Sequence, residues 1–185
     1  MTRSENDPAP YHARPPHATA TTDTRRPGPC RAWVALGSNL GDRKANLRRA
    51  LRWLDALPGV SVQAASPFLR TPPVGPPQPD YLNAVARLQV HLSPLALLDA
   101  LLTLERAAGR VRRPGERWGP RTLDLDLLVM ADPLGHLCRI AHPRLTLPHP
   151  RLEERRFVLE PFSHVDPGLR LASGLTVASR LATLP

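Results

Sequence analysis

Residues 116–130 read ERWGPRTLDLDLLVM and place two carboxylates, Asp124 and Asp126, inside an apolar run. The alternation of acids and leucines predicts a β-strand over residues 122–130. Because alternate residues of a strand share a face, both carboxylates are expected to point the same way while the intervening leucines face the core. At a rise of about 3.3 Å per residue, the two Cα atoms lie about 6–7 Å apart. Two carboxylates at this spacing are able to hold Mg²⁺.

Several arginines precede this strand in the sequence: Arg110, Arg112, Arg113, Arg117 and Arg121. Taken alone, a D-x-D pair is also compatible with an exposed strand face whose acids pair with arginines. Mg²⁺ on two acids facing guanidinium groups, however, is typical of a site for a nucleoside triphosphate. The chain has no G-x-x-x-x-G-K-[ST] sequence, which argues against a P-loop kinase.

Working outward from this strand, the hydrophobic pattern predicts further strands at residues 32–36, 60–71 and 81–92. One helix is expected to begin at an N-cap Asp42, and another to run from Ser93 to Gly109. The resulting β-α-β-β-α-β order predicts an α+β, ferredoxin-like sandwich, an antiparallel sheet with helices on its faces. A Pro- and His-rich loop, a short helix near 151–160 and a C-terminal amphipathic helix near 174–183 complete the expected fold as a helical extension.

The 185-residue chain is expected to consist of a disordered tail, residues 1–29, and a single domain, residues 30–185. The formal net charge is +9, which favours anionic partners without choosing among them. Two cysteines without a motif indicate neither a disulfide framework nor a metal site. The sequence shows no 18-residue apolar run and no secretory signal, so no membrane contact and a cytoplasmic location are expected.

Six blocks of the sequence carry a resemblance to a known family: VALGSNLGD, RTPPVG, PDYLNAV, GRVRR, RWGPRTLDLDLL and HPRLTLPHPRLEERRFVLEPF. Together, from about residue 32 to 168, they resemble 6-hydroxymethyl-7,8-dihydropterin pyrophosphokinase, an enzyme of folate biosynthesis. The resemblance implies transfer of the β,γ-pyrophosphate of ATP to the hydroxymethyl group of the dihydropterin, with release of AMP. It also implies two Mg²⁺ ions held by Asp124 and Asp126.

The resemblance assigns further residues to the two substrates. The pterin would be bound by Thr71, Val74, Tyr81, Asn83, Trp118 and Phe157. The ATP would be bound by Glu105, Arg110, Arg112, Arg113, Arg121, Arg144, Thr146, His149 and Arg155. The catalytic set would be Arg110, Arg121, Asp124 and Asp126. Leu102 and Pro150 depart from the family pattern near the adenine, so the adenine contacts stay open.

Two other functions are compatible with parts of the sequence. A basic nucleic-acid-binding module would explain the arginines, but the expected strands lack the aromatic pattern of an RNA-recognition sheet. Another Mg²⁺-dependent transferase with a D-x-D pair would explain the acids but not Tyr81, Asn83 and Phe157. We therefore expect an enzyme that acts as a monomer on small molecules and binds no nucleic acid.

Overall fold

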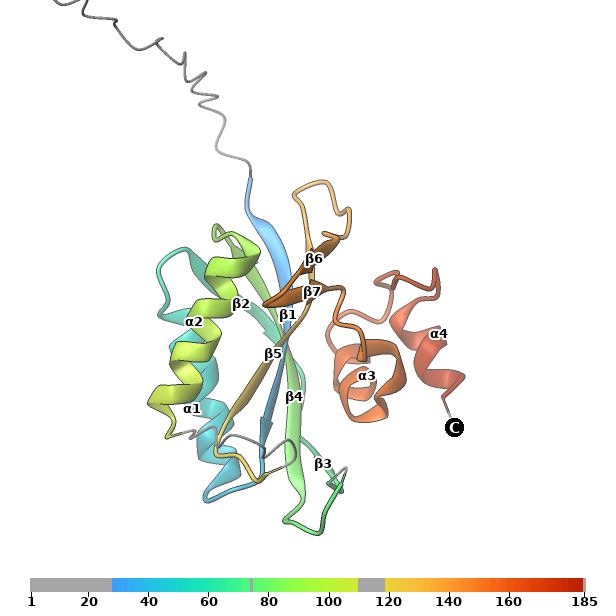
Figure 1. Ribbon diagram of the computed structural model, residues 1–185. Coiled ribbons are helices and arrows are strands. Elements are labelled where there is room, and N and C mark those ends of the chain that lie inside the picture. Colours follow the sequence, from blue (N-terminus) through green and yellow to red (C-terminus); the bar gives the residue numbers. More distant parts are fainter. Residues whose placement is uncertain (1–27, 74, 110–118, 185) are drawn as a thin grey trace, which may run out of the picture.

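A five-stranded antiparallel sheet forms the centre of the computed structural model, which describes residues 28–73, 75–109 and 119–184. Most of the predicted tail, residues 1–27, lies outside this description. The strands are β1 (Cys30–Ser38), β2 (Val60–Ala65), β3 (Leu69–Thr71), β4 (Tyr81–Val90) and β5 (Asp124–Ala131). They are ordered β2-β4-β1-β5, and β3 pairs with β4 (Figure 1). The strand with the two acids is therefore an edge strand.

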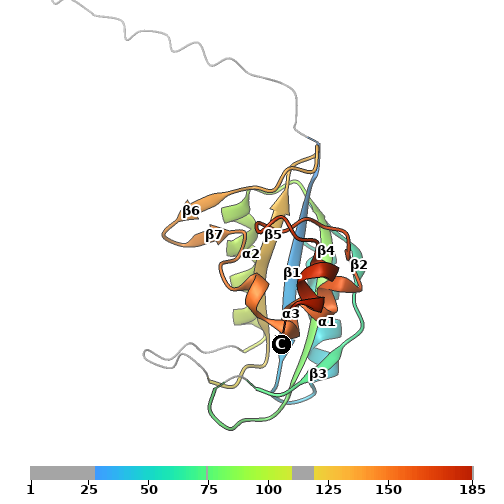
Figure 2. The same cartoon turned by 90° about the vertical axis from the view of Figure 1, so that its right-hand side faces the viewer.

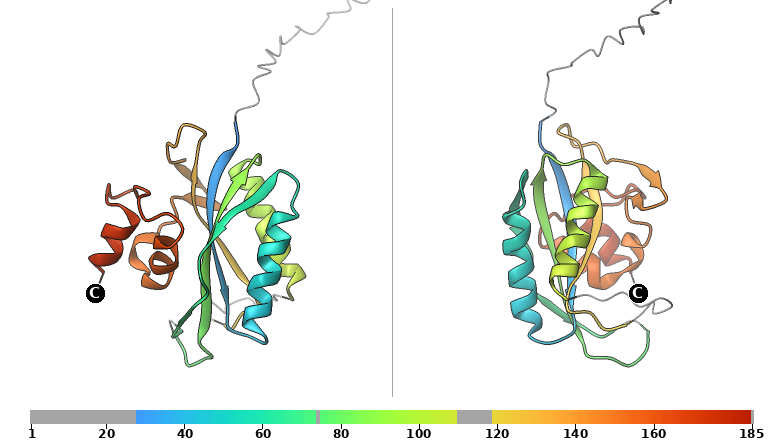
Figure 3. Two further views of the ribbon diagram at one scale, coloured as in Figure 1. Left: turned by 180° about the vertical axis from the view of Figure 1, so that it is seen from behind. Right: turned by 60° about the vertical axis from the view of Figure 1, so that its left-hand side comes forward.

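Helices cover both faces of this sheet. Helices α1 (Arg43–Asp55) and α2 (Pro94–Ala107) lie on one face, and α3 (Arg156–Ser163) and α4 (Val177–Ala182) lie on the other (Figures 1 and 3). The two predicted N-caps are confirmed, because Asp42 accepts a hydrogen bond from the Ala45 N–H and Ser93 accepts one from the Ala96 N–H. No helix in the described ranges is long and apolar enough to span a membrane.

The second predicted strand, residues 60–71, is wrong as a single strand. It is broken at Ser66 and Pro67 into β2 and β3. Proline has no N–H for the ladder, and the buried Ser66 hydroxyl instead accepts a hydrogen bond from the Val85 N–H at 3.0 Å. The chain then pairs again with β4, so that Thr71 lies opposite Tyr81 and Leu69 lies opposite Asn83. The break brings the end of β3 beside the first residues of β4.

The alternation predicted for the acidic strand is confirmed up to a β-bulge. Leu123, Leu125 and Leu127 are buried in the core under α1 and α2. The pairing between β1 and β5 then shifts register, so that Trp33 lies opposite Val129 while Val34 lies opposite Leu127. At and beyond this extra residue, Leu128, Val129 and Ala131 belong to the second core, beneath α3 and α4, while Met130 belongs to the first. The edge strand is thus buried on both faces near its end, and only its first part exposes polar groups.

The predicted Pro- and His-rich loop after β5 contains a hairpin that the sequence pattern did not indicate. Strands β6 (Ile140–His142) and β7 (Leu145–Leu147) pair antiparallel, and three residues per strand are too few for a period-2 signal. The short helix expected near 151–160 is a 3-10 turn, Leu152–Glu154, followed by α3, which extends further to Ser163. The expected helix near 174–183 is shorter, because Thr176 is its N-cap. Figure 2 shows α3 in front of the sheet.

Candidate active site

A pocket of about 220 Å³ lies between the sheet and the beginning of α3. Its lining includes Ala35 and Gly37 of β1 together with residues of β4, β5 and α3. Eight of the residues predicted for the site line this one pocket: Thr71, Tyr81, Asn83, Arg121, Asp124, Asp126, Arg155 and Phe157. Residues 86 positions apart in the sequence therefore surround the same space.

Each of the two acids lies beside an arginine. The Arg121 guanidinium donates to the Asp124 carboxylate at 2.6 Å, and the Arg155 guanidinium lies 3.7 Å from the Asp126 carboxylate. Burial in the pocket and the nearby Asp124 charge raise the pKa of Asp126, although His149 and the two arginines act in the opposite direction. The side chain of Asp126 is still 41% exposed, because the pocket is open to solvent. Its charged form is therefore incompletely compensated by the protein alone.

The same pocket is also lined by neutral polar groups and aromatic rings. Asn83 is buried and donates its amide N–H to the Thr71 hydroxyl at 2.7 Å. This bond leaves the Asn83 Oδ1 atom facing Gly37, where an added Cβ would lie 3.1 Å away. Phe157 is half-buried, and the Arg155 guanidinium lies 5.6 Å from its ring centroid. The arrangement suits a flat, hydrogen-bonding heterocycle.

Asn39 is a structural member of the site that the sequence analysis missed. It is 2% exposed, and its Oδ1 accepts the Arg121 N–H at 2.7 Å while its own N–H donates to the Arg121 carbonyl at 3.0 Å. Its amide N–H₂ donates to the Gln78 side chain at 2.9 Å and to the Pro79 carbonyl at 3.2 Å. Asn39 therefore joins the end of β1 to both loops beside the pocket. The GSN sequence was the available signal, but it is too common to indicate this role.

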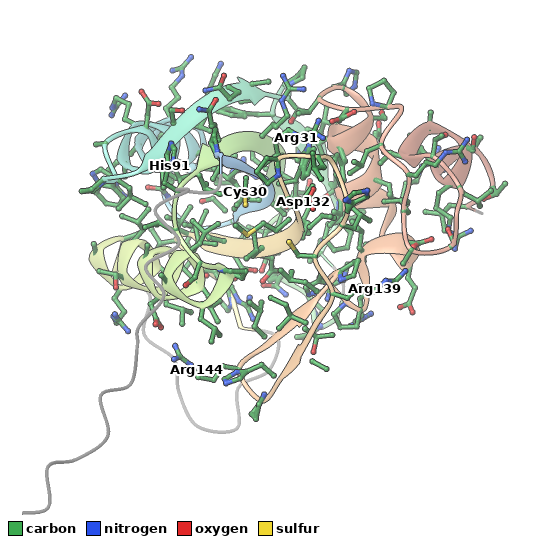
Figure 4. The ribbon with its side chains drawn as sticks, turned by 90° about the horizontal axis from the view of Figure 1, so that it is seen from above. Cys30, Arg31, His91, Asp132, Arg139 and Arg144 are labelled. Atoms are coloured by element: carbon green, nitrogen blue, oxygen red, sulfur yellow. The ribbon has the colours of Figure 1, made fainter. Side chains whose placement is uncertain are left out.

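Four other predicted residues do not line the pocket. Glu105, 2% exposed on α2, accepts the Leu125 N–H at 2.8 Å and so supports β5 from its core side. Arg144 lies in the turn of the β6–β7 hairpin, pairs with Asp99 of α2 and points away from the sheet (Figure 4). Thr146 is an exposed residue of β7.

The fourth, His149, interacts electrostatically with Asp126. Burial lowers the pKa of His149, in spite of the opposing effect of Asp126. Its Nδ1 atom accepts the Arg151 N–H at 3.2 Å, which places the proton of the neutral ring on Nε2. His149 is therefore able to act as a hydrogen-bond donor next to the acids.

Five predicted residues lie outside the described ranges: Val74, Arg110, Arg112, Arg113 and Trp118.

Comparison with known proteins identifies the family. Residues 33–167 match the model of the 7,8-dihydro-6-hydroxymethylpterin-pyrophosphokinase (HPPK) family. A 2-amino-4-hydroxy-6-hydroxymethyldihydropteridine pyrophosphokinase of Pseudomonas aeruginosa is 44% identical over 156 residues, which are 84% of this chain and 92% of that protein. An enzyme of the same name from Methylorubrum extorquens is 42% identical over 155 residues, 83% of this chain and 93% of that protein.

A solved structure of an HPPK-DHPS in complex with substrates has a similar fold. Its TM-score is 0.63 at 10% sequence identity, over 85% of this chain and 43% of that chain. This likeness supports the fold alone, and this chain spans less than half of that longer protein. The family match, the two relatives covered almost completely and the pocket that joins acids to aromatic residues agree: the chain belongs to the HPPK family of dihydropterin pyrophosphokinases.

Proposed function

We propose that the protein transfers the pyrophosphate group of ATP to the hydroxymethyl oxygen of 6-hydroxymethyl-7,8-dihydropterin, giving the dihydropterin diphosphate and AMP in folate biosynthesis. The names of the relatives describe this pyrophosphokinase activity. The observation that carries the proposal is the continuity of one pocket from Asn83 and Phe157 to Asp124 and Asp126. A ring bound at the first end would direct its substituent toward the acids at the second.

At the pterin end, we propose that Tyr81 and Phe157 cover the ring and that Asn83 binds its edge. In the described part of the chain nothing donates to the Asn83 Oδ1 atom, whose amide nitrogen is already fixed by Thr71. Asn83 lines the pocket, where its amide oxygen is able to accept a hydrogen bond from a partner. A pterin N–H group would provide that partner, with an orientation set by the bond to Thr71.

At the acidic end, the residues present fit Mg²⁺, and we propose two ions. Oxygen atoms are the preferred ligands of Mg²⁺, which commonly takes one or two carboxylates and completes its shell with water and substrate phosphates. The described residues contain no group of three or more metal-binding side chains, which agrees with such sharing. When bound, Mg²⁺ would neutralise phosphate charge and act as a Lewis acid.

The charges of the protein explain why the triphosphate would bind together with cations. Asp124 and Asp126 lie beside Arg121 and Arg155, so the formal charges of these four side chains cancel before any cation binds. The cancellation is only formal, because the arginines do not fully offset the cost of burying the Asp126 charge. Cations bound to the two acids would make this part of the pocket positive. The guanidinium groups would then be able to contact phosphate oxygens. We expect His149 to donate from Nε2 to phosphate, and Arg144 and Thr146 to contact the nucleotide further out.

We also propose a ferredoxin-like fold, an oligomeric state and a cellular location for the protein. The strand order and the two helices on one face support a ferredoxin-like arrangement for residues 30–185 as one domain. We further propose a monomer located in the cytoplasm.

The direct test measures AMP after the purified protein is mixed with ATP, Mg²⁺ and the dihydropterin. AMP should appear in equal amount with dihydropterin diphosphate and only when all three are present. Well-folded protein that forms no AMP would rule out the proposal. Release of AMP or ADP without the dihydropterin would instead show that water takes the transferred group, and the protein would then be an ATP hydrolase.

Gly37→Ala is expected to raise the KM for the dihydropterin by about tenfold, with little change in the KM for ATP. The added Cβ would push the Asn83 side chain aside by a few tenths of an ångström, and such a shift weakens a hydrogen bond to a positioned ligand. The new Cβ would lie 3.1 Å from the Asn83 Oδ1 atom and 3.7 Å from the Tyr81 ring. The hydrogen bond to Thr71 limits how far the Asn83 side chain is able to move away from the new Cβ. Steady-state kinetics with each substrate varied would measure the effect.

Gly168→Ala is the matched control, since a Cβ there would meet no atom within 4 Å. It should leave both KM values unchanged. An unchanged KM for the dihydropterin in Gly37→Ala would show that the pterin does not bind over Gly37.

A further inference from the structure

Arg43, the first residue of α1, reaches out of its helix to the strand that carries the pocket's Tyr81. Its Nη1 atom donates to the Asp80 carbonyl at 2.6 Å, across 37 positions of sequence. Asp80 directly precedes Tyr81 at the start of β4. Figure 3 shows the beginning of α1 and the turn between β3 and β4 at the same end of the sheet. A helix on one face of the sheet is thus linked to the entry of a strand whose side chains face the pocket.

Asp80 is held from two directions. Its carboxylate accepts the Arg70 Nε–H at 2.7 Å, and its carbonyl accepts the Arg43 guanidinium. Arg70 is 71% exposed, so solvent screens that ion pair and its contribution is small. Arg43 is half-buried, and a charged donor on a carbonyl makes a stronger bond. Of the two contacts, the one from Arg43 is therefore the one able to fix the backbone.

The place of Arg43 in its helix makes the contact significant. The first turn of a helix carries partial positive charge and favours acids, but the first turn of α1 contains none. Arg43 and Lys44 both stand there, against the helix dipole. Lys44 is exposed and makes no hydrogen bond or ion pair with the described residues. Arg43 and Lys44 thus share an unfavourable position at the helix N-terminus, and of these two cations Arg43 alone contacts Asp80.

The pocket depends on where β4 begins. β3 has three residues, and its pairing with β4 places Thr71 opposite Tyr81. The Thr71 hydroxyl in turn orients Asn83. A shift of Asp80 would displace Tyr81 and, through this short ladder, the partner of Asn83. Asn39 holds the preceding carbonyl, that of Pro79, so two consecutive carbonyls are fixed by different parts of the chain.

We propose that Arg43 is a positioning residue of the pterin pocket, which acts by fixing the Asp80 carbonyl and hence the Tyr81 ring. The inference rests on the proposed function in assigning the pocket to the pterin. The contact itself does not depend on that assignment. It places a determinant of substrate binding on α1, a helix that does not line the pocket.

Arg43→Gln is the test, with Lys44→Gln as the matched control, because both remove one positive charge from the same helix end. In Arg43→Gln the KM for the dihydropterin should rise about tenfold, the size expected for one hydrogen bond from a charged donor. The kcat should stay within about twofold, since no group near the phosphates changes. The melting temperature should fall by only a few degrees, because the lost hydrogen bond to Asp80 is partly offset by the removal of a cation from a helix N-terminus. Arg43→Lys, which keeps a cationic donor, should recover part of the loss.

Hydrogen exchange of the backbone amides of residues 80–83 gives a second readout that needs no substrate. These amides should exchange faster in Arg43→Gln than in Lys44→Gln or the wild type. An equal KM rise in both glutamine variants, or unchanged KM and exchange in Arg43→Gln, would overturn the proposal. Wild-type protein that forms no AMP would defeat the proposed function, and the exchange comparison alone would then decide whether Arg43 fixes the strand.

Discussion

Asp126→Asn is expected to lower the kcat by about 10²- to 10³-fold, the usual loss when one electrostatic group of a preorganised site is removed. Asparagine keeps the size and one oxygen of the side chain but not its negative charge. The substituted pocket would have one acid instead of two, and Arg121 and Arg155 would no longer be balanced. Binding of Mg²⁺ should weaken accordingly, because a neutral amide is a poorer ligand for a hard divalent cation.

The same substitution should leave the ligand-free protein as stable as the wild type or more stable. Burial and the charge of Asp124 raise the pKa of Asp126 above its ordinary value. A carboxyl group with a higher pKa in the folded than in the unfolded state binds its proton more tightly when folded. Its contribution to stability is therefore lost as the pH rises through the raised pKa, and at neutral pH the ionised group is a cost. Asparagine removes that cost.

Steady-state release of AMP and thermal unfolding without ligands would measure the two effects. Asp132→Asn is the control, since it makes the same chemical change on the turn after β5, where the carboxylate contacts His136. It should leave the kcat unchanged. A kcat of Asp126→Asn within about tenfold of the wild type would contradict the role of Asp126 as a metal ligand.

The sequence predicted those parts of the structure that depend on local pattern. The alternation around Asp124 and Asp126 correctly placed both acids on one face, and Asp42 and Ser93 cap the helices as expected. The element order through β5 agrees as well, apart from the break at Ser66. These features follow from side-chain period and from short-range hydrogen bonds, which a single sequence displays directly.

Long-range contacts account for what the sequence did not show. Asn39 and Arg121 are 82 positions apart, and neither neighbourhood indicates that they share two hydrogen bonds. Nothing local in the sequence distinguishes Arg43 from the other arginines of α1, yet Arg43 donates to the Asp80 carbonyl. Which of several similar arginines on a helix meets a partner is decided by tertiary packing. The same limit applies to the bulge in β5, whose register depends on its pairing with β1.

Trp33→Ala is expected to lower the free energy of unfolding by about 3–5 kcal/mol, the range for removing a large buried aromatic side chain. Trp33 is fully buried between the sheet and α3, and its ring centroid lies 6.2 Å from that of Phe162. The cavity left by alanine would open beneath the helix that carries Phe157. Denaturant unfolding would measure the loss. Trp53→Ala, at a half-buried position of α1, should cost clearly less because less apolar surface is lost from the core.

Trp33→Phe separates the packing of the ring from the polarity of the indole. The Trp33 Nε1–H is buried and has no hydrogen-bond partner in the described part of the chain, so the wild type already bears the cost of an unsatisfied donor. Phenylalanine fills most of the volume and removes that donor, so its net loss should stay below about 1.5 kcal/mol. A loss as large as that of Trp33→Ala would show that the outer edge of the indole, rather than its bulk, holds α3 against the sheet. The smaller loss would mean that filled volume alone keeps α3, and with it Phe157, in place beside the pocket.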